Sequence, residues 1–206
     1  PPPPSPSPIE AYISMEEEGH EWPFDDAFEA DTGTYPFGTL SAVASHVRTM
    51  RATTERVVSF APLSSTSLFV DLGCGVGAVT RHIADVVQCK TLGLDICEAE
   101  TEKARDGAPD WCSHVTADIL DLATHLPFFG EIDFKNLVVF LYLTPTMVAR
   151  RELRAMLEMY LAKGARVVTA IYHPPFWTPA AHDETFHLNL YTEASMTGAE
   201  DALLLR

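Results

Sequence analysis

Basic residues are scarce in this sequence. Its 206 residues include 14 lysines and arginines against 29 aspartates and glutamates, which gives a formal net charge of −15 at pH 7. Binding nucleic acid through a broad phosphate-neutralising surface requires the opposite balance. The composition therefore disfavours nucleic acid as a partner. It suits a basic protein partner, although an acidic surface also simply promotes solubility.

Long apolar runs and paired cysteine motifs are missing as well. No uninterrupted apolar stretch reaches the roughly 18 residues of a membrane-spanning helix, and no signal peptide is recognisable. Pro1 stands first where a complete chain begins with methionine, so the sequence can be a piece of a longer protein. The four cysteines (Cys74, Cys89, Cys97 and Cys112) form no C-x-x-C pair and no zinc-type spacing, so no metal is expected. Reduced thiols predict an intracellular protein, most simply cytoplasmic, with the nucleus and the mitochondrion as alternatives.

The chain divides into a tail and one domain. Residues 1–8 are rich in proline and serine, and residues 10–31 are acidic. We predict a largely disordered tail over residues 1–34 and a single domain over residues 35–206. Within the domain, apolar strand-like runs alternate with helical patterns and are followed by a terminal hairpin. This order predicts an α/β fold with a doubly wound, mostly parallel sheet and helices on both faces.

The expected elements follow from apolar periodicity. Strands are expected at 68–71, 91–95, 111–116, 136–143, 165–172, 185–191 and 202–205. Helices are expected at 40–58, 79–87, 97–106 and 145–163, the last beginning at a Thr-Pro pair and ending at Lys-Gly. The last two strands would form the antiparallel hairpin.

The most informative stretch runs from Leu68 to Gly77 and reads LFVDLGCGVG. A buried strand ends near Asp71, and glycines follow at every second position, where the missing Cβ lets a backbone approach a ligand. Gly73-x-Gly75-x-x-Ala78 also fits the dinucleotide fingerprint, so NAD is an alternative ligand and a purely structural turn is another. Asp71 favours an ammonium group, because an anion there repels a pyrophosphate.

The stretch resembles the first motif of the class I S-adenosylmethionine (SAM) methyltransferases, V-D-x-G-x-G-x-G, and the resemblance extends over residues 35–206. It implies a SAM-dependent methyltransferase with a seven-stranded, Rossmann-like sheet. It also implies that Asp71 faces the amino end of the cofactor's methionine. The cofactor-binding residues that it implies are Tyr35, Thr39, Asp71, Gly73, Cys74, Gly75, Asp95, Ile96, Asp118, Ile119 and Leu141.

Two further acids have expected roles. Asp95 lies 18 residues after Gly77, close to the spacing at which an acid meets ribose hydroxyls in such folds. Its alternative role is to cap the helix expected at 97–106. In the methyltransferase family an acid at the position of Asp118 accepts from the adenine amino group, and the neighbouring Ile119 would pack on the ring. The alternative for Asp118 is an ordinary turn aspartate.

Two further resemblances concern the methyl acceptor. Residues 139–145 (VFLYLTP), with residues 164–168 and Trp177, resemble small protein-lysine methyltransferases, including those acting on the ATP-synthase c subunit. Tyr35 and Gly38-Thr39-Leu40 resemble non-SET histone lysine methyltransferases, although Thr39 stands where that family has an acid. Both imply methyl transfer to a protein lysine. A small-molecule methyltransferase and a catalytically silent interaction domain are the alternatives.

Aromatic residues lie at or just beyond the carboxyl ends of the fourth and fifth predicted strands. The candidate substrate-channel residues are Tyr142, His173 and Trp177, with Tyr172 and Phe176 beside them. An apolar channel would favour a neutral lysine amine, whereas the alternative for each residue is a core or lid position. His173 is a possible base, but we assign no catalytic base. His173-Pro-Pro-Phe176 resembles the D/N-P-P-Y/F motif yet follows the fifth strand, so a rigid proline turn is its alternative.

Overall fold

The computed structural model describes residues 51–121, 127–129 and 132–196, all of which lie in one compact unit, Val47–Arg206. The predicted tail, the first part of the helix expected at 40–58 and the strand expected at 202–205 lie outside these residues. The domain boundary proposed at residue 35 therefore stays a prediction.

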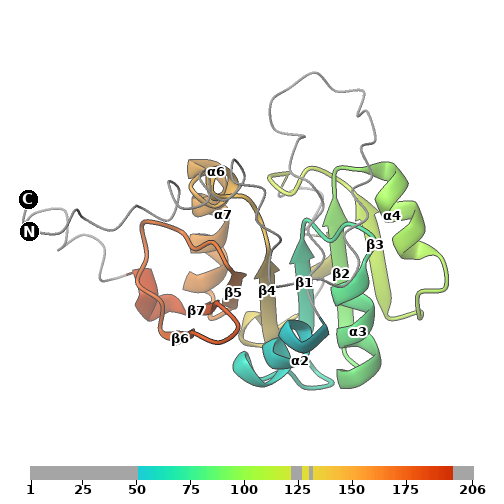
Figure 1. Cartoon of the computed structure of the whole chain (residues 1–206), viewed down its shortest axis with the longest axis horizontal. Helices are drawn as coiled ribbons and strands as arrows, with labels where there is room; N and C mark the ends of the chain where they lie inside the picture. Colours follow the sequence, from blue (N-terminus) through green and yellow to red (C-terminus); the bar gives the residue numbers. More distant parts are fainter. Residues whose placement is uncertain (1–50, 122–126, 130–131, 197–206) are drawn as a thin grey trace, which may run out of the picture. The chain divides into compact units, whose positions relative to one another are not determined.

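The centre of the domain is a seven-stranded sheet with the order β3-β2-β1-β4-β5-β7-β6 (Figure 1). Strands β1 to β5 run parallel, and β7 pairs antiparallel with both β5 and β6. The strands are β1 Leu68–Leu72, β2 Lys90–Asp95, β3 Cys112–Thr116, β4 Leu137–Leu141, β5 Arg166–Ala170, β6 Ala181–Asp183 and β7 Leu188–Tyr191. The predicted fold class, a mostly parallel sheet with an antiparallel hairpin at one end, is confirmed.

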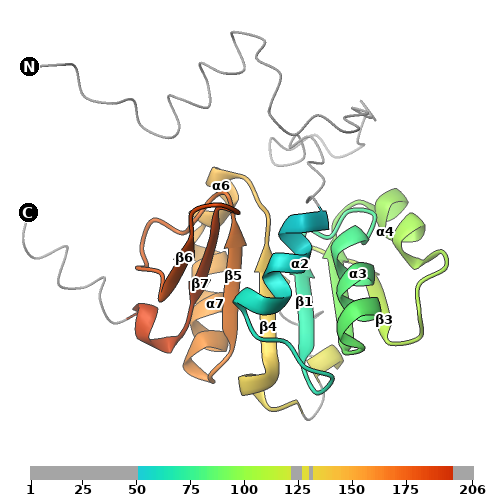
Figure 2. The same cartoon turned by 60° about the horizontal axis from the view of Figure 1, so that its bottom comes forward.

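Helices cover both faces of this sheet. Figure 2 shows α2 and α3 in front of the sheet and α7 behind it. The helices are α2 Arg51–Phe60, α3 Ala78–Val87, α4 Glu98–Arg105, α6 Pro145–Val148 and α7 Arg151–Ala162, with 3-10 turns η1 Phe134–Asn136 and η2 Glu193–Met196. In the described ranges no helix is both long and apolar enough to cross a membrane.

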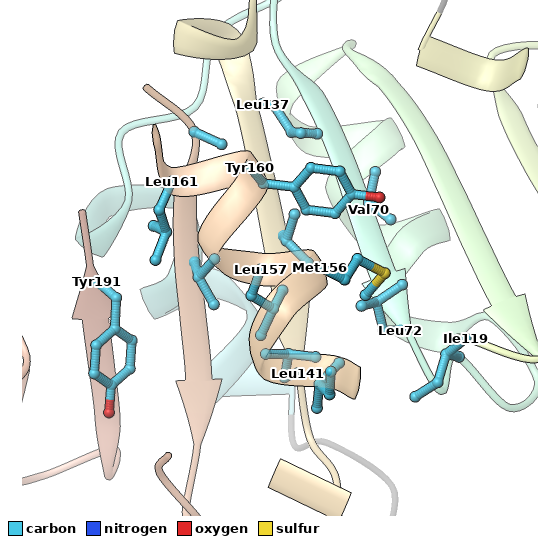
Figure 3. Close-up of a cluster of buried hydrophobic side chains, with 14 of the residues drawn as sticks. Val70, Leu72, Ile119, Leu137, Leu141, Met156, Leu157, Tyr160, Leu161 and Tyr191 are labelled. Atoms are coloured by element: carbon cyan, nitrogen blue, oxygen red, sulfur yellow. The ribbon is translucent and has the colours of Figure 1, made fainter. Parts of the chain in front are cut away.

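Two apolar clusters form the core, one on each face. Side chains alternate along β1, so that Val70 and Leu72 join the cluster under α7, whereas Phe69 joins the cluster under α2 and α3. All five residues of β1 and all five of β4 are buried, as expected of central strands covered on both faces. Figure 3 shows Met156 and Tyr160 of α7 lying over the strands of the first cluster.

The helix expected at 145–163 is in fact two helices, so this prediction was wrong in its continuity. Arg150 has φ −69° and ψ 137°, an extended conformation that ends the short α6. The carbonyl of Arg150 then accepts from the amide of Arg154 at 3.0 Å, which begins α7. The break leaves the apolar face of α7 free to follow its own direction across the sheet.

The hairpin uses a strand that the sequence did not indicate. Residues 181–183 lie outside every predicted strand and helix, yet they form β6 and pair with β7. Asp183 closes the turn between them, because its Oδ1 accepts from the amides of Thr185 and Phe186 at 3.0 and 3.1 Å. All three residues of β6 are exposed or half-buried, so no apolar alternation announces the strand.

Candidate functional site

A turn of five residues, Gly73 to Gly77, connects β1 to α3 at the carboxyl edge of the sheet. Its three glycines have φ values of 91°, 49° and 71°, a region that residues with a Cβ rarely adopt. The amides of Gly73 and Cys74 both donate to the carbonyl of Leu94, at 2.8 and 3.0 Å. The end of the neighbouring strand β2 therefore fixes the beginning of the turn.

Asp95, the last residue of β2, fixes the middle of the turn. Its Oδ2 accepts from the amide of Gly75 at 2.9 Å, and its Oδ1 accepts from the amide of Cys97 at 2.9 Å. Cys97 immediately precedes α4, so Asp95 does bind the entrance of that helix, as its alternative role suggested. An ionised carboxylate offers about four acceptor positions, so ribose hydroxyls could still bind. The ribose role stays a prediction.

Asp71 lies beneath the turn in β1 and is only 3% exposed. Burial, and secondly the negative charge of Asp95, raise the pKa of the Asp71 carboxyl to about 8. A cationic ligand group placed beside this carboxyl would offset both costs. Burial, followed by the charges of Asp71 and Asp95, also raises the pKa of the Cys74 thiol above its usual range. Cys74 therefore stays a neutral thiol.

The turn is open to a ligand at its centre. A Cβ added to Gly75 would meet no atom within 4 Å, whereas one added to Gly73 would lie 2.8 Å from Cδ2 of Leu143. A ligand can thus approach the backbone closely at Gly75, between the buried Asp71 and the carboxylate of Asp95. This arrangement fits a ligand that carries a cation at one end and hydroxyl groups farther along, as SAM does.

The residues expected to hold an adenine ring lie in different environments. Ile96 is 67% exposed directly after Asp95 and presents an apolar side chain to solvent. Asp118 is exposed, and its Oδ1 accepts from the amide of Leu120 at 2.9 Å, the arrangement of an ordinary turn aspartate. Ile119 is buried in the core cluster under α7. Their roles toward a cofactor stay predictions.

Of three other predicted cofactor residues, the structure describes one, Leu141. Leu141 is fully buried in β4, in register with Leu72 of β1. Tyr35 and Thr39 lie outside the described residues.

The structure does not bring the candidate channel residues together. Tyr142 packs against the core cluster under α2 and α3, whereas Trp177 belongs to the cluster under α7. The Trp177 ring lies edge-on to Phe176 at a centroid distance of 4.9 Å and is 5.7 Å from Tyr191. His173 is exposed. Trp177 is thus placed as a core residue, while Tyr142 and His173 remain accessible from the carboxyl edge.

Sequence reasoning missed the side chains that support the far end of the turn. Arg81 of α3 donates from Nη2 to the carbonyl of Val76 at 3.1 Å and from Nη1 to that of Asp106 at 3.1 Å. His114 of β3 meets Oγ1 of Thr80 at 2.7 Å. These residues come from separate elements and form no local motif, so their support of the turn could not be predicted from the sequence.

The described residues also bear on metal binding and on the cysteines. Over the three described ranges, no group of three His, Cys, Asp or Glu side chains is placed to hold a metal ion. All four cysteines are unpaired.

Comparison with known proteins adds independent findings. Residues 69–162 match the family described as a methyltransferase domain. A search of curated proteins found no match. An RNA methyltransferase from Salinibacter ruber, solved with S-adenosyl-L-homocysteine (SAH), is similar with a TM-score of 0.58 and 24% identity over 70% of this chain and 91% of that one. A SAM-dependent methyltransferase from Thiobacillus denitrificans, also solved with SAH, has a TM-score of 0.45 and 17% identity over 70% of this chain and 56% of that one.

The strand order, the antiparallel end of the sheet and the acid-flanked glycine turn define a class I, Rossmann-like methyltransferase fold. Together with the match of residues 69–162 to a methyltransferase domain, this fold supports the activity of a SAM-dependent methyltransferase, an enzyme whose cofactor is SAM.

Proposed function

We propose that this methyltransferase methylates the side-chain amine of a protein lysine. The observation that carries the proposal is the character of the carboxyl edge beyond β4 and β5. Residues 142–150 and 171–180 include tyrosine, phenylalanine, tryptophan and four prolines but no aspartate or glutamate. A lysine amine has an ordinary pKa of about 10.4 and must lose its proton before it can attack. Surroundings that are apolar and free of carboxylates favour the neutral amine.

The cofactor would lie across the glycine turn. Asp71 would accept from the ammonium group, Asp95 from the ribose hydroxyls, and Gly75 would allow close backbone contact. Ile96 is exposed beside Asp95 and would pack against the adenine ring, with Asp118 accepting from the adenine amino group. When bound, SAM supplies a sulfonium methyl group that a neutral nitrogen displaces in line.

The protein would contribute mainly alignment and exclusion of water. Good alignment of two reacting centres can contribute about 7–11 kcal/mol to lowering the barrier. Asp71 and Asp95 would fix the donor, while Tyr142, with Tyr172 and His173 after β5, would orient the amine and keep water away from it. The lysine ammonium would lose its proton to bulk water before the neutral amine enters the site, so the proposal requires no catalytic base.

Three classes of acceptor are distinguished by one experiment. The full chain is incubated with methyl-labelled SAM and cell extract, and protein, RNA and small-molecule fractions are counted separately. We expect label in protein, recovered as methyl-lysine after acid hydrolysis. Label only in RNA or only in small molecules would overturn the lysine proposal. The RNA fraction is included because one similar structure is an RNA methyltransferase, although the net charge of −15 disfavours that acceptor.

Two variants serve as controls for this assay. Asp71→Ala removes the carboxyl expected to hold the cofactor and should abolish labelling. Asp110→Ala makes the same side-chain replacement at an exposed acid before β3 and should leave labelling intact. We expect the enzyme to act inside the cell, where its four unpaired cysteines stay reduced.

A further inference from the structure

A buried histidine fills the space beneath the cofactor turn. His114 of β3 is 6% exposed. A Cβ added to Gly77 would collide with Nε2 of this ring, and one added to Gly93 of β2 would lie 2.7 Å from its Cδ2. The imidazole therefore occupies a hollow that exists only because both neighbouring positions are glycine. One of them, Gly77, is the last glycine of the turn.

The histidine lies in the same row of the sheet as the proposed cofactor acid. Asp71, Gly93 and His114 are in register on β1, β2 and β3, which lie side by side in Figure 1. Register partners on adjacent strands point to the same face of a sheet. Cys74 lies over the middle of the row, since a Cβ on Gly93 would be 2.7 Å from its Sγ. The row thus reaches from Asp71 to the far end of the turn.

Hydrogen bonds connect the ring to the turn through Thr80. Oγ1 of Thr80 is 2.7 Å from Nε2 of His114 and donates to the carbonyl of Gly77 at 3.0 Å. A hydroxyl has one proton, so the donation to Gly77 requires that Nε2–H of His114 donates to Thr80. The opposite tautomer would bury an N–H at Nδ1, an atom that has no partner among the described residues. The arrangement therefore selects the Nε2–H tautomer.

The ring is neutral at physiological pH. Burial, followed by the positive charges of Arg81 on α3 and Arg105 on α4, lowers the pKa of His114 to about 4. The thiol of Cys112 on β3, at 3.8 Å from Nε2, is a further titratable group beside the ring, and burial raises its pKa, so it is uncharged. A neutral imidazole with one defined tautomer is a fixed donor over the whole physiological range.

We propose that His114 is a positioning residue of the cofactor site, acting through Thr80. The Thr80 hydroxyl binds the carbonyl of Gly77 alongside the backbone amide of Arg81, which donates to the same oxygen at 3.0 Å. Held by His114, this hydroxyl helps to set the peptide planes at the end of the turn, and so the open face of Gly75 against which the cofactor would bind. Arg81 donates to the adjacent Val76 carbonyl, and Asp95 accepts from the Gly75 amide. This inference rests on the cofactor assignment but not on the choice of acceptor.

The test measures SAH binding by calorimetry, which needs no acceptor. Thr80→Val removes the hydroxyl and keeps the shape, and Thr80→Ser keeps the hydroxyl. Loss of a hydrogen bond of ordinary strength should weaken SAH binding about three- to tenfold in Thr80→Val, while Thr80→Ser stays near wild type. In the same way His114→Gln, which retains a donor near Nε2, should bind SAH better than His114→Leu.

A matched control separates positioning from general stability. Thr101 of α4 is also fully buried, its hydroxyl also donates to the carbonyl three residues earlier, Glu98, at 3.0 Å, and it meets a second side chain, Thr116. Thr101→Val should lower the thermal unfolding midpoint as Thr80→Val does. It should leave the affinity for SAH unchanged, because no bond from Thr101 reaches the turn.

The outcomes are distinguishable. If the wild-type chain does not bind SAH, the cofactor assignment falls and this inference falls with it. If the wild type binds but Thr80→Val binds equally well, or Thr101→Val weakens binding as much, only the positioning role is overturned. Nitrogen NMR of the wild-type ring gives a second readout that does not depend on any variant folding. A proton on Nδ1 of His114 at pH 7 would overturn the proposal.

Discussion

The carboxylate of Asp95 accepts a hydrogen bond from the backbone amide of Gly75, 20 positions earlier in the chain, at 2.9 Å. Its other oxygen holds the amide of Cys97 at the same distance. The end of β2, the glycine turn and the entrance to α4 are therefore joined by one side chain. An acid expected to bind the cofactor also shapes the turn that receives it.

Replacing this acid should affect both roles. Asparagine has a single acceptor oxygen, so Asp95→Asn can hold only one of the two amides and would present an N–H₂ group to the other. Removing a hydrogen bond to a charged group predicts SAH binding weakened by about ten- to a hundredfold, measured by calorimetry. Asp110→Asn makes the same charge change at an exposed site and should bind normally. Equal affinities for the two variants would contradict the dual role.

Asp71 should make the cofactor-free protein less stable as pH rises. The pKa of its carboxyl is about 8 in the folded state against an ordinary value of 3.8, so the folded state binds the proton more tightly. The resulting stabilisation is complete below about pH 4 and is lost as the pH rises through 8. Asp71→Asn removes the group that titrates. Relative to wild type, the variant should gain at least about 1 kcal/mol of unfolding free energy between pH 5 and pH 9.

Urea unfolding at these two pH values measures the difference. Asp110→Asn provides the control, because it changes the net charge without touching the buried site. An Asp71→Asn protein whose stability follows pH as the wild type's does would show that Asp71 is not the group responsible.

Cofactor binding should strengthen as the pH rises, whereas the stability of the cofactor-free protein should fall. Below its pKa of about 8 the free Asp71 carboxyl is mostly protonated, and pairing with an ammonium group requires the carboxylate. Binding of SAH should therefore release a proton, and affinity should rise with pH by at most about tenfold per unit before levelling near pH 8. Calorimetry in two buffers with different ionisation heats counts the protons. No proton release, or an unchanged slope in Asp71→Asn, would remove Asp71 from the ammonium site.

Ile171 carries backbone strain at the carboxyl end of β5. Its φ is 63°, and the amide of Tyr172 donates to the carbonyl of Ala170 across it at 2.7 Å. A β-branched residue in this region costs about 1–3 kcal/mol. Ile171 is 40% exposed, so replacing it removes partly buried contacts, and Ile171→Ala removes most of the same contacts as Ile171→Gly. After the glycine entropy of about 0.5–1 kcal/mol, Ile171→Gly should have an unfolding free energy about 1 kcal/mol higher than that of Ile171→Ala.

The alanine variant is the reference that separates backbone strain from the loss of the side chain. Ile171→Ala keeps a Cβ and therefore most of the strain, so it should not be stabilised. Thermal unfolding of both variants decides the matter: a glycine variant no more stable than the alanine variant would mean that the positive φ is not costly here.

The five parallel strands could be predicted from the sequence, but the edge strand β6 could not. Strands β1 to β5 lie within two residues of their predicted ends, because turns bound each run and the central strands β1 and β4 are buried and apolar. The strand β6 consists of Ala181, His182 and Asp183, which carry no apolar pattern. It exists because β7 offers a free edge and Asp183 closes the turn between them.

The candidate site, too, could be predicted only in part from the sequence. Asp71, the turn glycines and Asp95 were predicted to lie together, and the Asp95–Gly75 bond shows that they do. Their contacts with a cofactor stay predictions. Tyr142 and Trp177 were grouped because both follow strands, but their side chains pack against opposite core clusters. Spacing along the chain says which edge of the sheet a residue reaches but not which face its side chain joins.

The sequence by itself determined the strand, the glycine turn and the helix of the cofactor motif, because periodicity and the φ preferences of glycine act within a few residues. Only the tertiary structure decided the raised pKa of Asp71 and the placement of His114 under Gly77. Both depend on burial and on distances between segments far apart in the chain, and no local pattern encodes those.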